Sequence, residues 1–262
     1  MKMFKIIKYS FYDLMRSRWN YVYFLFYLAL GFVLLFLNND VSKAVITLMN
    51  IIVVLTPLIG TIFGVMYYYN SREFTELLLA QPIRRSTIFI GQYLGLSLSL
   101  SISLVLGLGI PFILYGAIQT TVIFNFLSLL LTGMFLSFIF VGISFIIALK
   151  NENKIKGFGF AIVMWLLLAI IYDGLFLITL LVFDEYPLDK FSLIATVFNP
   201  IDLSRILILL KLDISALMGY TGAVFEKYFG TQLGLFLSYL SLILWVVLPA
   251  WAIVKISESK DF

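Results

Sequence analysis

The chain contains no cysteine and no histidine, and only 12% of its residues are charged. Without these two residue types, disulfides, thiolate or imidazole catalysis and the usual zinc or copper ligands are excluded. Intramembrane zinc proteases and histidine-dependent serine proteases are therefore excluded as well. A lipid-modifying enzyme that works with carboxylates alone remains as a weak alternative.

Hydrophobic residues make up 62% of the chain, and the mean hydropathy is +1.07. Soluble domains have about one quarter charged residues, so a chain this apolar needs lipid as its solvent. We expect an all-α integral membrane protein with a single transmembrane domain over residues 1–262. No polar stretch is long enough to form a soluble catalytic domain, so soluble machinery would come from other chains.

Six apolar segments approach or exceed the length of about twenty residues that a helix needs to cross a bilayer. Pro57 and Pro111 fall inside the second and third of them and predict kinks. The predicted spans are 21–37, 44–69, 87–115, 121–149, 157–183 and 231–256.

The lysines and arginines predict how these spans are oriented. If the N-terminus is cytoplasmic, 13 of the 18 cationic residues lie inside and 5 outside. The positive-inside rule then places both termini in the cytoplasm, in a multi-pass protein of the inner (cytoplasmic) membrane. The cations lie between apolar runs and form no single basic face, so the net charge of +4 does not indicate nucleic acid as a partner.

Two segments outside the spans are also apolar enough to meet the membrane. Residues 1–19 place Phe4, Ile7, Phe11 and Leu14 at helical spacing, which predicts an amphipathic interfacial helix; the alternative is an early start of the first span. Residues 184–230 form the longest non-spanning stretch, and we expect short extracytoplasmic helices there that lie on the outer leaflet or dip into it.

The loop at 70–86 predicts a short amphipathic helix between the second and third spans. Asn70 can cap this helix, and Phe74, Leu77 and Leu78 share one face. Pro82 ends it. Its apolar face is covered either by the bilayer or by a partner protein, and spacing alone does not decide between them.

Asp173 is an acidic residue within the fifth apolar run, where an unpaired charge is costly. Arg205 is a conceivable partner for it. Asn199 and Pro200 read as a helix cap and a first helical residue, followed by Asp202. These residues have either a structural role or a role in a transport path or in contact with an extracytoplasmic partner.

The stretch from Arg72 through Gln81 and Pro82 to Arg85 resembles the coupling loop of type-2 permeases of the ATP-binding-cassette family. Tyr172-Asp173-Gly174 and the run from Asn199 to Arg205 are similar to the NosY-type permeases of nitrous oxide reductase maturation. The similarity extends in order and hydropathy over nearly the whole chain.

This resemblance implies a homodimer that couples ATP hydrolysis by a separate NosF-like cytoplasmic ATPase to transport or to extracytoplasmic work on the copper site of nitrous oxide reductase. A NosD-like protein would sit on the outer loop, and a NosL-like copper chaperone would join the assembly. The implied ATPase-coupling residues are Arg72, Glu73, Phe74, Glu76, Leu77, Leu78, Gln81, Pro82, Arg84 and Arg85.

The chain has no Gly-x-x-x-x-Gly-Lys-Ser/Thr phosphate loop, so we expect it not to be an enzyme, with ATP and Mg bound by the partner ATPase. Its eight methionines are scattered, so copper would be held elsewhere and the chain itself would bind neither metal nor cofactor. A type-2 permease that exports a lipid, peptide or drug is the alternative within the family. A secondary transporter is less favoured. Such proteins often have paired halves and several buried ionisable groups, whereas this sequence has one acid within a span and no obvious repeat.

Overall fold

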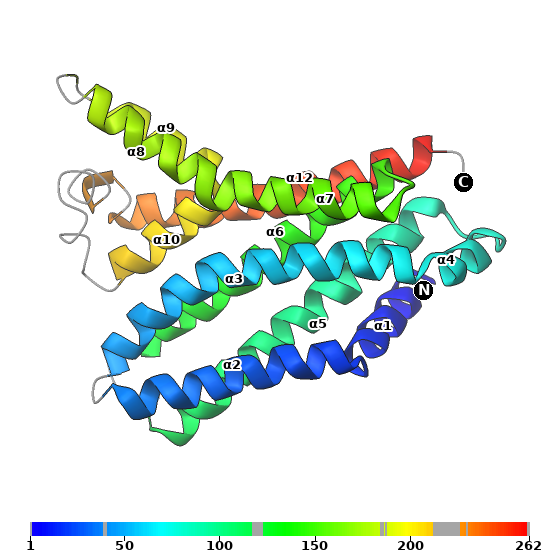
Figure 1. Cartoon of the computed structure of the whole chain (residues 1–262), viewed down its shortest axis with the longest axis horizontal. Coiled ribbons are helices and arrows are strands. Elements are labelled where there is room, and N and C mark those ends of the chain that lie inside the picture. The colour runs from blue at the N-terminus through cyan, green and yellow to red at the C-terminus, as the bar shows by residue number, and fades with distance from the viewer. Residues whose placement is uncertain are drawn as a thin grey trace.

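The structure is a computed structural model that describes residues 2–38, 41–116, 123–183, 186, 188–211, 226–228 and 230–260, and all its regular elements in this part of the chain are helices (Figure 1). Six of these helices are long and apolar enough to cross a membrane. The predicted all-α class and the six spans are therefore confirmed. The spans are α2 (Arg18–Leu37), α3 (Val41–Asn70), α5 (Arg85–Leu114), α6 (Ile123–Lys150), the continuous run of α7 (Lys154–Leu166), η2 (Leu167–Ile171) and α8 (Tyr172–Val182), and α12 (Gln232–Ser259).

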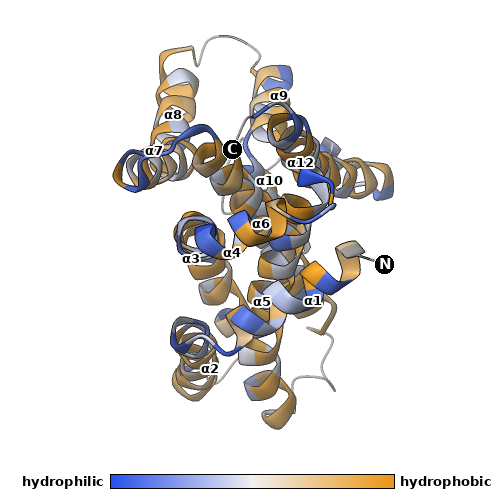
Figure 2. Cartoon of the chain, turned by 90° about the vertical axis from the view of Figure 1, so that its right-hand side faces the viewer, coloured by the Kyte–Doolittle hydropathy of each residue, from blue (hydrophilic) through white to orange (hydrophobic). Residues whose placement is uncertain are grey.

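α5 and α6 are the most buried spans, and α2, the α7 to α8 run and α12 are the most exposed. Figure 2 looks along the bundle and shows orange, apolar residues over the outward surfaces of the helices. Large side chains such as Phe36 and Leu181 are almost fully exposed there, which suits contact with lipid and would be costly in water.

α1 (Lys2–Met15) is a helix of its own, because the chain turns at Arg16 and Ser17 before α2 begins. It packs along α5 at two glycines: a Cβ on Gly91 would lie 2.7 Å from the Ile6 side chain, and one on Gly95 would lie 2.7 Å from Ser10 Cβ. Side chains at these positions would push the helices apart, so the glycines permit the close contact.

The contact face of α1 differs from the predicted apolar stripe. Leu14 is buried, but Phe4 is 70% exposed, and the residues that meet α5 most closely are Ile6 and Ser10. The stripe predicted from spacing did not include Ser10, because a hydroxyl does not add to an apolar pattern.

α3 and α6 pack together over much of their length. Gly64 provides the space for Ser144, whose hydroxyl occupies the position that a Cβ on Gly64 would need. Pro57 lies inside α3 and Pro111 inside α5, at the predicted positions.

Two further helices, α9 (Asp189–Phe198) and α10 (Pro200–Lys211), meet at 114°. α10 is inserted among α3, α6 and α12, and its Ile201, Leu203, Leu207 and Ile208 are fully buried. The stretch predicted at 184–230 thus contains one helix that belongs to the protein interior. Within that stretch, residues 184–185, 187, 212–225 and 229 lie outside the described residues, as do 121–122 at the predicted start of the fourth span.

Candidate functional site

Asn199 organises the start of α10. Its side-chain Oδ1 accepts a hydrogen bond from the Ile201 backbone N–H at 3.1 Å, and Pro200 is the first helical residue, as the pattern predicted. Proline suits this position because its missing N–H would have had no partner within the helix. Asn199 is fully buried, so its amide group also needs partners inside the protein.

The Asn199 Nδ2 donates to the Leu168 backbone oxygen at 2.9 Å and to Asp202 Oδ2 at 2.8 Å. In an α-helix the Leu168 oxygen would accept from the Tyr172 N–H, but here that N–H bonds to the Leu167 oxygen. The π-helical turn η2 thus leaves the Leu168 oxygen available for Asn199. One side chain thus joins the π-helical turn of the fifth span to the start of α10, and such π-bulges are frequent at functional sites.

A cluster of three charges lies beside this joint. Arg205 Nη1 is 3.0 Å from Asp173 Oδ2 and 3.4 Å from Asp202 Oδ1. Asp173 and Arg205, which the sequence analysis considered as partners, are therefore in contact. One guanidinium faces two carboxylates, so the cluster has a formal charge of −1 when both are ionised. The Tyr172 hydroxyl donates to the Ala195 oxygen at 2.7 Å, which also joins α8 to α9.

Asp202 lies outside the six spanning helices and is 8% exposed. Burial raises the pKa of its carboxyl to about 6. Arg205 and the Asn199 hydrogen bond lower that pKa, whereas the nearby negative charge of Asp173 raises it. Burial therefore favours the protonated form of this carboxyl more than an exposed aspartate would.

α4 (Arg72–Leu79) lies at the other end of the bundle, near α1 and the C-terminal end of α12 (Figure 1). The predicted Asn70 cap is wrong, because α3 continues through Asn70 and the residue that precedes α4 is Ser71. Asn70 Oδ1 instead accepts a hydrogen bond from Lys154 Nζ at 3.1 Å. The long apolar run of the second span carries its helix further than the cap pattern indicated.

Two contacts join α4 to α1 and α5. The Phe74 ring stacks on Tyr9 of α1, with 4.4 Å between ring centroids. The buried Thr75 hydroxyl accepts from Gln92 Nε2 of α5 at 2.8 Å and donates to the Ser71 oxygen at 2.8 Å. Sequence reasoning missed Gln92, although an isolated glutamine in an apolar span is itself a signal.

The predicted common face of Phe74, Leu77 and Leu78 is divided in the structure. Phe74 and Leu78 are half-buried, but Leu77 is 68% exposed and points away from the bundle with the acidic side chains of α4. The exposed residues among those implied by the resemblance are Arg72, Glu73, Glu76, Leu77, Gln81, Pro82 and Arg84. They form what we call the α4 surface.

Arg85 differs from its neighbour Arg84. Its side chain is half-buried, and its guanidinium donates to the Lys260 backbone oxygen, while Lys260 Nζ donates to the Leu149 oxygen at 2.8 Å. Arg85 and Lys260 together thus join the ends of α5, α12 and α6, and the Arg85 guanidinium is engaged within the chain. Arg84 is exposed at the same turn.

In the part of the chain that the structure describes, no three acidic side chains gather as they would to hold a metal ion. The folded chain is a multi-pass α-helical membrane protein with a polar cluster at one end and an exposed helix at the other. No model of a known protein family matches the sequence, and no curated protein matches it.

Proposed function

We propose that this chain is the membrane-spanning permease subunit of an ATP-binding-cassette transporter, which works as a homodimer and takes its energy from a separate cytoplasmic ATPase. The observation that carries the proposal is α4, a short helix whose outer surface is exposed while its inner surface contacts α1 and the spanning helix α5. An exposed surface offers a docking site, and the fixed surface transmits displacement.

Force on α4 has two routes into the membrane. Phe74 pushes on Tyr9 and therefore on α1, and Thr75 pulls on Gln92 and therefore on α5. α1 and α5 are packed closely at Gly91 and Gly95, so both routes act on the same pair of helices. Packed helices move as discrete units, so a small displacement of α4 becomes a shift of α5 against its neighbours.

At the far end, α10 is packed among α3, α6 and α12 and joined to the fifth span by Asn199 and Arg205. A shift among the spans reaches this cluster through those contacts. In the proposed transporter, Asp173, Asn199, Pro200, Asp202 and Arg205 pass the movement to the extracytoplasmic side, as part of a transport path or of a partner contact.

The more specific part of the proposal is a NosY-like role in copper-site maturation of nitrous oxide reductase, in the cytoplasmic membrane with both termini inside. A NosF-like ATPase would bind the α4 surface, and a NosD-like protein and a NosL-like chaperone would meet the opposite side. Support comes from the motifs around Arg72, Asp173 and Asn199 and from the cations near the α4 end, such as Arg84 and Lys154.

Co-purification tests the docking surface. We expect Leu77→Asp and Arg84→Glu to reduce recovery of a co-expressed NosF-like ATPase, because both change exposed side chains on the α4 surface. Lys190→Gln, an exposed change on α9 far from the α4 surface, is the control and should leave recovery unchanged. Undiminished recovery with both α4 variants would reject the docking site.

Phe74→Ala separates docking from coupling. The substitution removes the ring that stacks on Tyr9 but leaves Leu77 and Arg84 in place. We expect the ATPase to remain bound while ATP hydrolysis in proteoliposomes loses its dependence on the permease. Loss of binding, or hydrolysis that stays as dependent as in the wild type, would contradict this route.

A further inference from the structure

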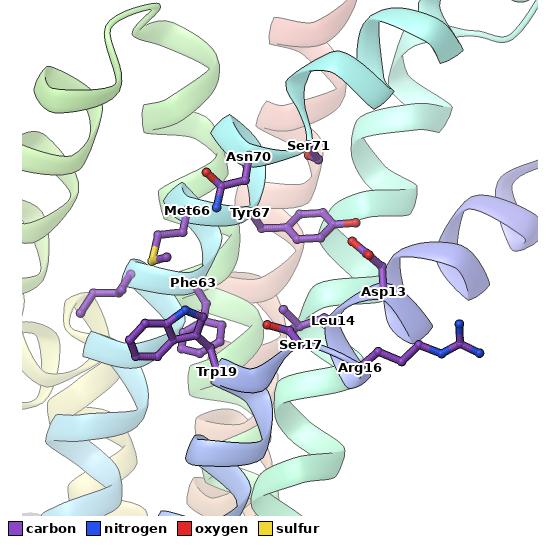
Figure 3. A pocket seen from close by; sticks show the side chains of 11 residues that line it. Asp13, Leu14, Arg16, Ser17, Trp19, Phe63, Met66, Tyr67, Asn70 and Ser71 are labelled. Atoms are coloured by element: carbon purple, nitrogen blue, oxygen red, sulfur yellow. The ribbon is translucent and has the colours of Figure 1, made fainter.

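A cavity of about 670 Å³ lies between the turn that joins α1 to α2 and the last turns of α3 (Figure 3). Its volume falls within the range of sites that hold small organic molecules. The lining comes from residues 13–19 and 62–71, at the end of the bundle where α4 lies. None of these residues forms the α4 surface or the Asp173 cluster, so the cavity needs its own explanation.

The lining changes from polar to apolar along the direction of α3. Asp13, Asn70 and Ser71 line the end of the cavity near the aqueous side, while Ile62 and Phe63 line it further into the span. Ile62 precedes Asn70 by eight residues, which is about 12 Å along a helix. An occupant that fits both ends has a polar head at the membrane surface and an apolar tail below it.

Trp19, in the first turn of α2, marks the depth of this cavity. Its side chain is 62% exposed and lines the cavity wall. Tryptophan is enriched at the boundary between headgroups and acyl chains. The polar end of the cavity is therefore level with lipid headgroups of the leaflet on the α1 side.

Besides Arg16, the polar groups of the lining include one carboxylate, the Asn70 amide and three hydroxyls, and each of these can accept a hydrogen bond. Figure 3 shows the Asp13 carboxylate turned toward Tyr67, whose hydroxyl is buried and has no hydrogen-bond partner within the described residues. Ser17 and Ser71 add hydroxyls. A carboxylate with hydroxyls around it suits a group that donates several hydrogen bonds and has a positive charge, as a primary ammonium does.

The cation of the lining lies at the rim. The Arg16 side chain is exposed, and Figure 3 shows its guanidinium turned outward from the cavity. Arginine binds phosphate through two parallel hydrogen bonds. An ammonium at Asp13 and a phosphate at Arg16 are the two charges of one zwitterionic headgroup.

We propose that this cavity binds a phospholipid with a primary amine in its headgroup, an ethanolamine phospholipid from the leaflet on the α1 side. The ammonium lies at Asp13, the phosphate at Arg16, and the acyl chains run along Phe63 and Trp19. Choline lipids have no N–H to donate, and glycerol lipids leave the Asp13 charge without a counter-ion. This site stands apart from the proposed transporter role.

Native mass spectrometry of delipidated protein tests the proposal with ethanolamine, choline and glycerol phospholipids of identical acyl chains. We expect the ethanolamine lipid to bind about tenfold more tightly, the effect of one charge-assisted hydrogen bond. Asp13→Asn should abolish this preference, and Arg16→Gln should weaken all three lipids alike. Glu258→Gln, an exposed acid on α12, is the matched control and should change nothing.

Met66→Trp gives a second, independent variant, because it fills the cavity without changing a charge. It should remove lipid binding even if Asp13→Asn proves unable to fold. Soluble phosphoethanolamine should bind far more weakly than the lipid. Equal binding of the three lipids, a preference that survives Asp13→Asn, or phosphoethanolamine binding as tight as that of the lipid would overturn the proposal.

Discussion

Arg205 Nη1 lies 3.0 Å from Asp173 Oδ2 and thereby joins α10 to the fifth span, across 32 residues of sequence. The Arg205 and Asp173 side chains are 25% and 31% exposed, so both are partly shielded from water. Shielding strengthens the attraction between them and also raises the cost of leaving either charge alone. The same guanidinium neutralises Asp202, so its removal affects two carboxylates.

Arg205→Gln should therefore lower the free energy of unfolding by about 1–3 kcal/mol, since it leaves two partly buried acids without a cation. Thermal unfolding of the purified protein in detergent measures this loss. Asp173→Asn should recover part of it when combined with Arg205→Gln, because the two residues interact directly. Lys190→Gln, an exposed change on α9, is the control; equal effects from Lys190→Gln and Arg205→Gln would contradict the shielded ion pair.

The pH dependence of stability should reveal Asp202. Its pKa is about 6 in the folded protein and 3.8 when unperturbed, so the folded state holds the proton more tightly than the unfolded chain does. Stability from this group therefore falls as pH rises from 3.8 to about 6 and is level above that window. Melting temperatures measured from pH 4 to pH 8 should show this fall in the wild type.

Asp202→Asn is the test variant for that fall, because an amide keeps an oxygen that can accept from Asn199 but cannot titrate. Its melting temperature should depend less on pH below about pH 6 than that of the wild type. Parallel curves for the two proteins would assign the titration to other groups.

The spans were predictable from sequence because lipid demands long apolar runs, and α2, α3 and α5 follow that demand directly. The start of α10 was predictable for a local reason. Asn199 and Pro200 supply their cap within three residues, so no distant contact is needed.

The contacts between helices were not predictable in the same way. Spacing placed Phe74 and Leu77 on one side of α4, but Tyr9 of α1 covers only Phe74. The π-helical turn at Leu167–Ile171 contains no proline or glycine from which it could have been predicted. The Leu168 oxygen that it leaves available accepts from Asn199, which is 31 residues away in sequence. Such features depend on which helices meet, and a single chain's periodicity does not encode this.

Gly95→Ala should separate α1 from α5. A Cβ at Gly95 would lie 2.7 Å from Ser10 Cβ and 2.8 Å from the Ile7 backbone oxygen, so the backbone of α1 would have to move. Overpacking of this kind costs about 1–3 kcal/mol. Gly109→Ala on the same helix is the matched control, because a Cβ there meets no atom within 4 Å, and alanine favours the helix by up to about 1 kcal/mol.

A single engineered cysteine at Ser10 reports on this contact, because the chain has no cysteine of its own and Ser10 is fully buried. A maleimide should label Ser10→Cys slowly in the parent chain and in the Gly109→Ala background, but rapidly with Gly95→Ala, because a displaced α1 exposes the thiol. Melting temperatures should follow the same order. If Gly95→Ala protects the thiol as well as Gly109→Ala does and melts at the same temperature, α1 is not held against α5 by this close approach, and the route from α4 through Tyr9 into the spans loses its mechanical basis.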